Sequence, residues 1–395
     1  MAFLQVSLYL NLKHKKMNAQ PDPIKVAFIL PAFYRNGAVN LIVNLAEHLT
    51  SHNIEVELFA VRECEQRSPL PKAPVKFKTV LKEYQSTLSG LPKLLYRLVR
   101  SVLNADVVAY TWENGILIPG IIAFVLRKPT IAIVQNNIQR VSENADNRDR
   151  ERTIRRWVYN RCQAIVCVGN GLTSTIEPGI DSAKVMPIQN GINVEKVRRL
   201  SQAACPAQIT KFIEDDTPFI IGVGRLTSQK GFDLLIRAHA AAINQGAQHK
   251  LVLIGEGEQK DDLSRLVKEL GVSDSVVFLG YLSNPYPVIA QATLFCLSSR
   301  YEGFVLVGAE AAALGVPTVA TNCVSGPKEL LLDGLYGDLV AVDSVGELAI
   351  AIQRHLENPQ RLIEKASASA QKADRLSMKL CASRYSELLH RCAGQ

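Results

Sequence analysis

Short apolar runs alternate with amphipathic helical segments along almost the whole chain. This pattern is typical of βαβ units, in which parallel strands form a sheet with helices on its two faces. The sequence has 395 residues, 47% of them apolar, which is enough for two such domains, each with its own core. We therefore predict an α/β chain with two doubly wound domains.

The predicted elements divide the chain into two halves. The stretch 201–217 is polar and contains Pro206, so we predict that it links the domains. Residues 1–20 are predicted to be a disordered or weakly anchoring extension, or the product of an early start codon, with Met17 as the alternative start. The predicted organisation is an extension (1–20), a first domain (21–200), a linker (201–217), a second domain (218–378) and a final helix (379–395).

Two glutamates, Glu302 and Glu310, lie eight positions apart around the start of a predicted helix. Gly303 leaves the backbone free to turn before this helix, an alanine run favours the helix, and Gly315 ends it. The first N–H groups of a helix lack intrahelical partners and carry the positive end of its dipole, so they can bind a phosphate oxygen. The segment therefore predicts an anion site between two carboxylates.

Two cations follow the buried strand predicted at 219–223. Arg225 and Lys230 lie in the loop between this strand and a helix that begins after Gly231. Open α/β sheets bind their ligands at such loops. Any one of these charged residues would usually be an ordinary surface residue. Together, at these spacings, the cations and the two glutamates predict a pocket for a diphosphate and for sugar hydroxyls.

The segment from about 219 to 340 resembles the donor-binding half of a retaining glycosyltransferase of family 4, also called glycosyl transferases group 1. The resemblance implies the GT-B fold, in which two Rossmann-like domains face each other across a cleft and a C-terminal helix crosses back to the first domain. Val305 departs from the family, which commonly has glycine there, and Cys323-Val-Ser-Gly-Pro replaces a Gly-Gly pair. The matching motifs are Gly222-Val-Gly-Arg225 with Lys230-Gly231, Leu253-Ile-Gly255-Glu-Gly257, Val277-Phe-Leu-Gly280-Tyr281, the Glu302 to Glu310 segment, Gly315-Val-Pro317 and Ser325-Gly-Pro-Lys-Glu329.

The resemblance also implies a role for each matching side chain. Arg225 and Lys230 would neutralise the nucleotide diphosphate. Glu310 would hold the ribose, and Glu302 would contact the transferred sugar. The expected catalytic residues are therefore Arg225, Lys230 and Glu302. The expected donor-binding residues are Gly37, Gly224, Arg225, Lys230, Gly255, Tyr281, Glu302, Gly303, Phe304, Val305, Leu306 and Glu310.

The first half resembles the family less closely, and we expect it to bind the acceptor. Asn36 and Gly37 take the place of a Gly-Gly loop that faces the donor, and Gly37 lets the backbone approach a ligand closely. After the strand predicted at 130–134, Gln135 and Asn136 stand where many relatives have a histidine. No general base is assigned there. Asn36, Gln135 and Asn136 are expected to hydrogen-bond the acceptor or the transferred sugar.

Charge is distributed unevenly between the two halves. Residues 1–205 contain 27 Lys and Arg against 16 Asp and Glu, a net charge of +11, whereas residues 206–395 contain 18 against 21, a net charge of −3. The stretches 91–103 and 148–161 concentrate the cations of the first half. Such segments suit an anionic membrane surface, although an ordinary solvent-facing helix has the same pattern. The sequence has no nucleic-acid-binding motif, which argues against a nucleic acid as partner.

Cysteine spacing and hydropathy bear on location. The eight cysteines form no Cys-x-x-Cys pair and lack zinc-ligand spacing, which favours a reducing compartment. The apolar run 116–126 is about half of the ~20 residues that a membrane span requires. We predict a cytoplasmic protein, either free or peripheral on the inner face of the cytoplasmic membrane.

The expected activity is transfer of a hexose or N-acetylhexosamine from a nucleotide diphosphate sugar to a saccharide or lipid-linked acceptor in polysaccharide or lipopolysaccharide synthesis. The expected nucleotide is UDP. The transfer should retain the anomeric configuration. It should need no metal ion or other cofactor, because Arg225, Lys230 and a helix N-terminus can stabilise the leaving diphosphate and no Asp-x-Asp motif is present. Two alternatives are a GT-B subunit that binds the sugar nucleotide without transferring it, and a sugar-nucleotide epimerase.

Overall fold

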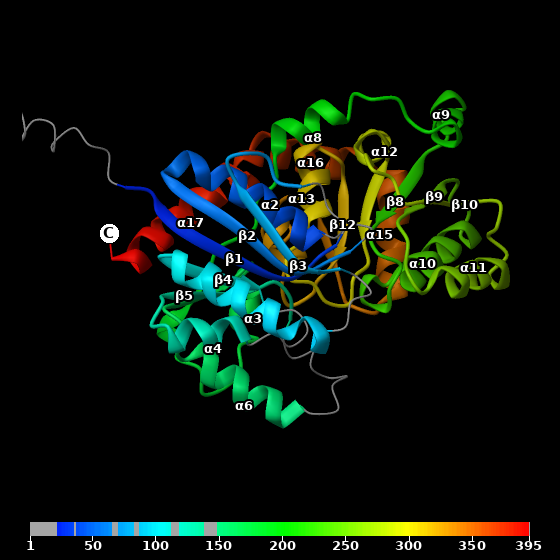
Figure 1. The fold of residues 1–395 in the computed structure, drawn as a ribbon. Coiled ribbons are helices and arrows are strands. Elements are labelled where there is room, and N and C mark those ends of the chain that lie inside the picture. Colours follow the sequence, from blue (N-terminus) through cyan, green and yellow to red (C-terminus); the bar gives the residue numbers. More distant parts are fainter. Residues whose placement is uncertain are drawn as a thin grey trace, which may run out of the picture.

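The computed structural model describes residues 22–34, 37–64, 70–82, 87–111, 118–137 and 148–394. In these residues two separate sheets, each flanked by helices, make up two lobes (Figure 1). Every strand pair in both sheets is parallel. The predicted fold class, an α/β chain with two doubly wound sheets, is confirmed.

The first sheet has seven strands in the order β3-β2-β1-β4-β5-β6-β7. Its central strands are apolar runs in which every residue is buried, as expected where helices cover both faces of a parallel sheet. Chain direction around the sheet reverses between β1 and β4, and such a switch point opens a crevice at the carboxyl ends of the strands. The strands are β1 (Ile24–Phe33), β2 (Ile54–Glu63), β3 (Lys76–Lys82), β4 (Val107–Thr111), β5 (Thr130–Val134), β6 (Ala164–Cys167) and β7 (Val185–Pro187).

The helices of the first lobe connect these strands. Helix α2 turns its apolar side chains toward the sheet, where Leu41, Ile42 and Leu45 are buried. Helix α3 is longer and more basic, and it packs beside α4. The helices are α2 (Gly37–Leu49), α3 (Thr87–Asn104), α4 (Ile118–Val125), α6 (Arg148–Tyr159) and α7 (Asn170–Thr173), with the 3-10 turns η1 (Thr50–His52) and η2 (Ser182–Lys184).

The second sheet has six strands in the order β10-β9-β8-β11-β12-β13, so its switch point lies between β8 and β11. The strands are β8 (Phe219–Val223), β9 (Lys250–Ile254), β10 (Val276–Gly280), β11 (Leu294–Leu297), β12 (Thr318–Thr321) and β13 (Asp338–Val340). The helices are α10 (Phe232–Asn244), α11 (Lys260–Glu269), α12 (Tyr286–Gln291), α13 (Leu306–Ala313), α14 (Pro327–Leu330), α15 (Val345–Glu357) and α16 (Gln360–Gln371), with the 3-10 turns η3 (Ser228–Lys230) and η4 (Ala373–Leu376).

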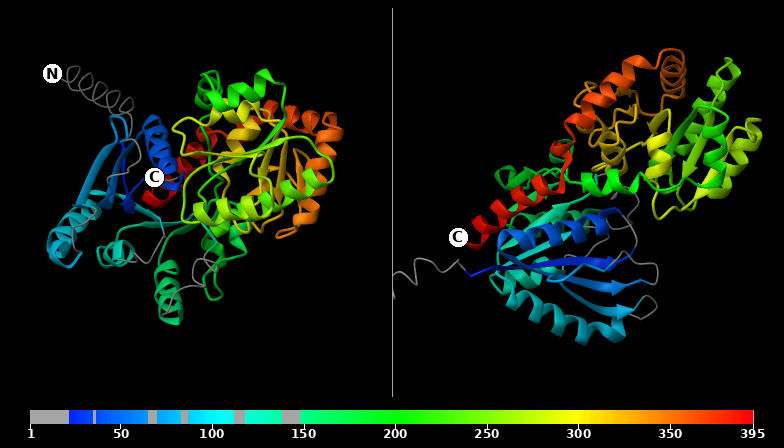
Figure 2. Two further views of the ribbon diagram at one scale, coloured as in Figure 1. Left: turned by 90° about the vertical axis from the view of Figure 1, so that its right-hand side faces the viewer. Right: turned by 90° about the horizontal axis from the view of Figure 1, so that it is seen from above.

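The chain passes between the lobes twice. On the first passage it forms α8 (Val194–Leu200) and α9 (Ala207–Glu214), and α9 is a helix that the sequence did not predict within the linker. On the second passage α17 (Met378–Ala393) returns to the first lobe and packs on α2, β1 and β4 (Figure 2). The returning helix expected of a GT-B fold is therefore present.

The two passages lie side by side. Ile192 N–H donates to the carbonyl of Leu376, and Met378 N–H donates to the carbonyl of Ile192, each at 2.8 Å. A Cβ atom on Gly191 would lie 2.6 Å from the Met378 Cα, so only glycine allows this contact. The two crossings are thus joined by backbone hydrogen bonds.

No helix in the described ranges is both long enough and apolar enough to cross a bilayer. The apolar run 116–126, which its length predicts to be a buried helix, corresponds in part to α4, eight residues long. Residues 116 and 117 lie outside the described part of the chain. The prediction of burial is wrong for one face of α4, where Ile118, Phe124 and Val125 are exposed.

Candidate active site

Glycine loops at the carboxyl ends of β8, β9 and β10 form one side of the site. The Gly224 N–H donates to the carbonyl of Ile254 at 3.0 Å, and the Gly255 N–H donates to the carbonyl of Gly280 at 2.8 Å. A Cβ atom on Gly255 would lie 1.8 Å from the Gly224 carbonyl oxygen, and the φ angle of Gly255 is 139°. Only glycine fits there. These contacts hold the loop that carries Arg225 in place.

An ion pair joins the segments that follow β8 and β11, the two strands at the switch point of the second sheet. Lys230 Nζ lies 2.6 Å from Glu302 Oε1, and the Ser299 hydroxyl donates to the same oxygen at 2.6 Å. The Glu302 side chain is only 5% exposed and that of Lys230 is 19% exposed. Two residues predicted to bind opposite ends of the donor therefore contact each other. Burial with two partners fixes the Glu302 carboxylate.

The turn that carries Lys230 is held by its neighbour across the sheet. Gly231 has a left-handed backbone, with φ 60°, and a Cβ atom there would lie 2.2 Å from the Ser298 carbonyl oxygen. The Ser298 hydroxyl donates to the carbonyl of Lys230 at 2.9 Å. Close packing against the end of β11 thus positions the lysine.

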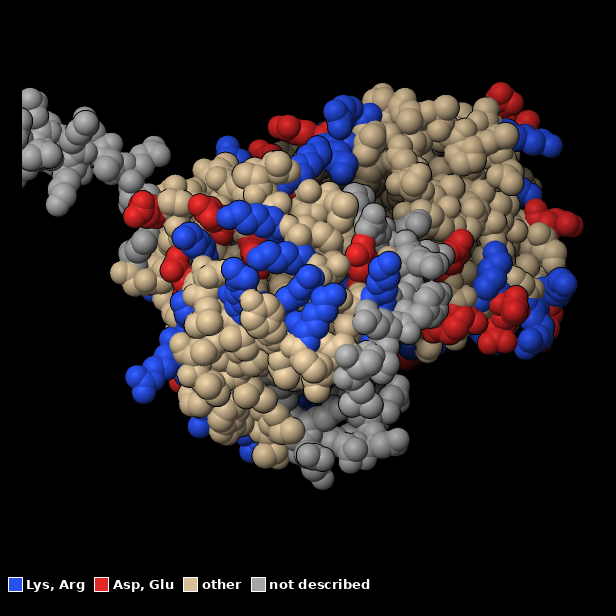
Figure 3. Space-filling model, in the orientation of Figure 1, with Lys and Arg blue, Asp and Glu red and all other residues tan. Residues whose placement is uncertain are grey.

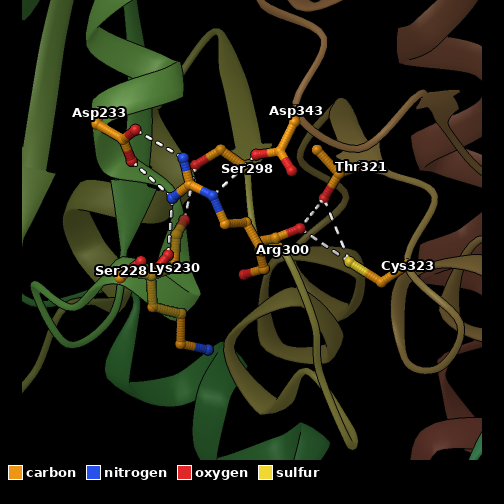
Figure 4. Close-up of polar contacts among 9 residues, drawn as sticks. Ser228, Lys230, Asp233, Ser298, Arg300, Thr321, Cys323 and Asp343 are labelled. Atoms are coloured by element: carbon orange, nitrogen blue, oxygen red, sulfur yellow. Dashed lines mark hydrogen bonds and ion pairs between the residues drawn. The ribbon is translucent and has the colours of Figure 1, made fainter. Parts of the chain in front are cut away.

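Arg300 ties this turn to two further elements (Figure 4). Its terminal nitrogens donate to both carboxylate oxygens of Asp233, at 2.8 and 2.7 Å, and Nη1 also donates to the carbonyl of Ser228 at 2.8 Å. Its Nε donates to Asp343 at 2.8 Å. Burial alone would raise the pKa of Asp233, but the hydrogen bonds and charge of Arg300 lower it below its usual value. Sequence reasoning missed Arg300, although it stands two positions before Glu302.

A second cluster in Figure 4 holds the loop after β11 from the other side. The carbonyl of Ser299 accepts hydrogen bonds from the Thr321 hydroxyl and, at 2.9 Å, from the Cys323 thiol. Burial raises the pKa of Cys323 to about 11, so this thiol stays protonated and acts as a donor. The departure at Cys323 from the family pattern therefore has a structural role in this chain.

Glu310 lies in the second turn of α13 and is partly buried. Tyr286, at the start of α12, donates its hydroxyl to Glu310 Oε1 at 2.9 Å. Burial raises the pKa of Glu310 to about 7, against the lowering effects of the Tyr286 hydrogen bond and the charge of Lys196. Within the described residues Glu310 makes no hydrogen bond or ion pair with Lys230 or Glu302. The motif thus places its two carboxylates in different surroundings, one ion-paired and one near half-protonation at neutral pH.

The N-terminus of α13 offers unpaired backbone donors. Val305 is the N-cap residue, and no side chain in the described part of the structure caps the helix there. Phe304 and Val305 are buried, which fixes the backbone ahead of Leu306. The first N–H groups of this helix can therefore bind an anion.

Loops of the first lobe lie directly against this segment. A Cβ atom on Gly303 would lie 1.9 Å from the carbonyl oxygen of Gln135, and one on Gly37 would lie 3.1 Å from the Leu306 side chain. The loops after β1 and β5 therefore face the loop after β11 across the lobes. The predicted residue Asn36 lies outside the described residues.

Buried amide groups stand at this boundary. The Asn190 side chain donates to Gln135 Oε1 at 3.4 Å, and both side chains are more than nine-tenths buried. Gln135 Nε2, Asn136 Oδ1 and Asn190 Oδ1 have no hydrogen-bond partner among the residues that the structure describes. Buried polar atoms usually have a partner, so these three can bind hydroxyl groups of a ligand. Sequence reasoning assigned no such role to Asn190.

Glu329 links the lobes on the far side of Gly303. Its two carboxylate oxygens accept hydrogen bonds from the backbone N–H groups of Gly171, at 2.6 Å, and Asn170, at 2.7 Å. The Ser325 hydroxyl donates to the carbonyl of Gly303 at 2.7 Å. Glu329 belongs to a motif that the sequence identified, but its contact depends on the start of α7, more than 150 positions earlier in the chain.

The other predicted residues lie at the same edge of the sheet. Arg225 is exposed, and its side chain has no hydrogen bond or ion pair among the residues the structure describes. Tyr281 is 46% exposed and follows β10. The free guanidinium group of Arg225 leaves a cation available to an incoming anion.

Two lobes of parallel α/β structure with a returning C-terminal helix and a charged site at the strand ends define the GT-B class of glycosyltransferases. Two family models match the chain: Glycosyltransferase Family 4 over residues 35–196 and Glycosyl transferases group 1 over residues 208–374. Together they account for most of its length. The chain belongs to this family of GT-B glycosyltransferases.

Curated relatives match parts of the chain. An N-acetylgalactosamine-N,N'-diacetylbacillosaminyl-diphospho-undecaprenol 4-alpha-N-acetylgalactosaminyltransferase of Campylobacter jejuni is 39% identical over 140 residues, 35% of this chain and 38% of that protein. The lipopolysaccharide core biosynthesis glycosyltransferase LpsD of Rhizobium meliloti is 29% identical over 242 residues, 59% of this chain and 65% of that protein. The chain thus spans less than two thirds of the length of either relative.

A solved structure matches nearly the whole chain. The crystal structure of Anabaena HepE in complex with UDP and glucose superposes with a TM-score of 0.76 over 93% of this chain and 100% of that one, at 20% identity. At this identity the likeness concerns the fold.

Proposed function

We propose that the protein transfers a hexose or N-acetylhexosamine from a UDP-linked sugar to a saccharide or lipid-linked acceptor in cell-surface glycan synthesis, with retention of configuration. The observation that carries this proposal is the Lys230–Glu302 pair beside the N-terminus of α13. It brings a cation, a fixed carboxylate and free backbone donors to the switch point where α/β sheets bind ligands.

The mechanism follows from these groups. The diphosphate of the donor is bound by Arg225, by Lys230 and by the first N–H groups of α13. Lys230 then exchanges its contact with Glu302 for a phosphate oxygen, which leaves the Glu302 carboxylate to accept hydrogen bonds from sugar hydroxyls. Donors that are already in position stabilise the charge that develops on the leaving diphosphate.

The lobe boundary supplies contacts for the sugar and the acceptor. The unpartnered amide atoms of Gln135, Asn136 and Asn190 can bind hydroxyl groups next to Gly303. On the donor lobe, Glu310 can bind the ribose hydroxyls, with Tyr286 orienting its carboxylate. The amide groups are neutral and Glu310 is near half-protonation, so these groups can form hydrogen bonds with sugar hydroxyls.

Relatives support the substrate classes. The name of the Campylobacter relative gives a diphospho-undecaprenol saccharide as acceptor, LpsD acts in lipopolysaccharide core biosynthesis, and HepE was crystallised with UDP and glucose. The basic first half of this chain supports a peripheral location on an anionic membrane, where a lipid-linked acceptor would lie. Arg225, Lys230 and α13 support a mechanism that needs no divalent ion.

Labelled donors test the activity. The full chain is incubated with a panel of UDP-linked sugars, each with and without undecaprenyl-diphosphate-linked and lipopolysaccharide-core acceptors. Transfer yields free UDP and a labelled acceptor, whose anomeric configuration is read by NMR. An epimerase would convert the donor without any acceptor, and a binding subunit would yield neither product. Activity abolished by EDTA and restored by Mg²⁺ would contradict the metal-free mechanism.

Lys230→Ala provides the matched variant. Loss of one preorganised cation should lower kcat by roughly 10²–10³-fold while the fold is kept. Lys268→Ala, at an exposed position on α11, is the control and should retain full activity. Near-normal turnover in Lys230→Ala would exclude the assigned role.

A further inference from the structure

Large apolar side chains are exposed unusually often on three neighbouring helices of the first lobe. Among the described residues, seventeen large apolar side chains are exposed, and eight of them lie on α3, α4 and α6. The exposed fraction reaches 64% for Tyr96 and 70% for Val125. Contiguous exposed apolar area of this kind marks an interaction surface. The eight residues, which we call the α3–α4–α6 surface, are Leu95, Tyr96, Leu103, Ile118, Ile121, Phe124, Val125 and Trp157.

The spacing of these residues places them in stripes. On α4, Ile118, Ile121, Phe124 and Val125 recur at intervals of three and four positions, which is one face of a helix. Helix α3 packs beside α4, and the Trp157 ring of α6 meets the Phe124 ring edge-on at 5.2 Å between centroids. The three helices therefore present one continuous surface.

Cations border this surface. The Arg161 guanidinium lies 4.0 Å from the Trp157 ring centroid and 5.1 Å from that of Phe124. A hollow of about 180 Å³ beside these rings is also lined by Arg127 and Lys128. A cation held over aromatic rings, next to a hollow lined by further cations, suits a phosphate group that lies above an apolar layer.

Acidic residues are absent from two of these three helices. Neither α3 nor α4 contains Asp or Glu, and α3 carries Lys93, Arg97 and Arg100. On α6, Arg152 and Arg155 pair with Glu177, and Arg156 is exposed. In Figure 3 the face over α3 and α4 is mostly tan and blue, with little red. The surface is therefore complementary in charge to an anionic partner.

We infer that the α3–α4–α6 surface docks on an anionic lipid bilayer. Its apolar residues enter the boundary between headgroups and acyl chains, Trp157 and Tyr96 lie at headgroup depth, and Arg127, Lys128 and Arg161 contact lipid phosphates. Exposed aliphatic side chains beside cations fit a bilayer better than a nucleic acid, which would need stacking rings along a basic groove. The inference rests on the proposed membrane location and identifies the face that makes the contact.

Vesicle sedimentation of the full chain tests it. Binding to mixed phosphatidylglycerol and phosphatidylcholine vesicles is expected to exceed binding to pure phosphatidylcholine vesicles and to weaken as NaCl is added. The double variant Phe124→Asp with Val125→Asp should lose about tenfold or more of its partition coefficient, because two inserted apolar side chains become charged. The matched control is Ile350→Asp with Ile363→Asp, on exposed positions of α15 and α16, and it should bind as the parent chain does.

Three further measurements guard against misfolding and against general charge attraction. Thermal unfolding must be unchanged in the double variants. In a Trp112→Phe background, emission from Trp157 should shift to shorter wavelength only with anionic vesicles. Arg127→Glu with Arg161→Glu should lower vesicle binding and its salt dependence together.

Several outcomes would overturn the inference. They are the absence of vesicle binding, equal binding by the Phe124/Val125 variant and the parent chain, and a concentration-dependent dimer that this variant dissolves. Specific capture of RNA at this surface, without vesicle binding, would also overturn it. UDP binding is measured by thermal shift without vesicles, so that the two proposals can fail separately. Intact UDP binding without vesicle binding would contradict the docking surface and leave the proposed transferase function standing.

Discussion

At the scale of single residues, the candidate site contains two carboxylates that differ in their hydrogen-bond partners. Glu302 accepts hydrogen bonds from Lys230 and Ser299 and therefore lies in direct contact with a cation. Glu310 has the Tyr286 hydroxyl as its partner, and burial raises its pKa to about 7. A shared motif therefore provides one ion-paired carboxylate and one group that titrates near neutrality.

The raised pKa of Glu310 predicts how stability depends on pH. Between pH 4.5 and about 7 the folded chain keeps a proton that the unfolded chain has lost, so the contribution of Glu310 to stability falls as the pH rises through this window. Glu310→Gln should remove that fall. Its free energy of unfolding at pH 8 should exceed that of the parent chain by roughly 1–3 kcal/mol, since one pKa unit corresponds to about 1.4 kcal/mol.

Urea unfolding at pH 5 and pH 8 measures this difference. The advantage of Glu310→Gln should be present at pH 8 and small at pH 5. Glu269→Gln, on the exposed face of α11, is the control and should show no such pH dependence. An equal change at both pH values would refute the assignment of the raised pKa to Glu310.

At the scale of elements, Arg300 joins the turn η3, helix α10 and the loop before α15. Arg300→Ala should leave Asp233 without its bidentate partner and release the turn that carries Lys230. Losing hydrogen bonds between charged groups typically costs about 1.5–3 kcal/mol, so stability should fall by that order. Transfer should fall by about tenfold or more, because Lys230 is no longer held.

Steady-state kinetics and calorimetry together check this. Arg300→Lys should restore little, since lysine cannot make the paired hydrogen bonds of a guanidinium group. The control is Arg265→Ala, which breaks an exposed ion pair with Asp262 on α11 and should change neither quantity. Full transfer activity in Arg300→Ala would mean that the turn keeps its position without this arginine.

Comparison of elements shows what could be predicted from the sequence. The buried strands β5 and β8 were predicted at their observed bounds, because fully apolar runs between turn residues have few other structures available. Strand β3 was missed: lysines alternate with its other residues, and it lies at the sheet edge, where such charges guard against further pairing. Helix α9 was missed because it is short and follows Pro206 in a polar stretch.

The candidate site, like the fold, could be predicted from the sequence only in part. Local motifs predicted Arg225, Lys230 and both glutamates, because their spacing follows the strand and helix on which they lie. The contacts of Arg300 and Glu329 could not be predicted, since their partners come from distant segments that only the folded chain brings together.

At the scale of the whole molecule, Glu329 ties the second lobe to the first at Asn170 and Gly171. Glu329→Ala should remove two charge-assisted hydrogen bonds and favour a wider separation of the lobes. Small-angle scattering with UDP present should report a larger radius of gyration, and kcat/KM should fall by about tenfold because Gln135 no longer faces Gly303. Glu364→Ala, on the exposed face of α16, is the control. Unchanged scattering and kinetics would show that closure does not depend on this carboxylate.

The paired crossings at Ile192 and Ser377 set the kind of motion that remains. Because the two crossings are hydrogen-bonded to each other at one place, they form a single hinge. Such a hinge favours rotation of one lobe relative to the other over sliding of the lobes. Opening and shutting would therefore follow a single path. The groups on either side of the gap would return to the same register after every catalytic cycle.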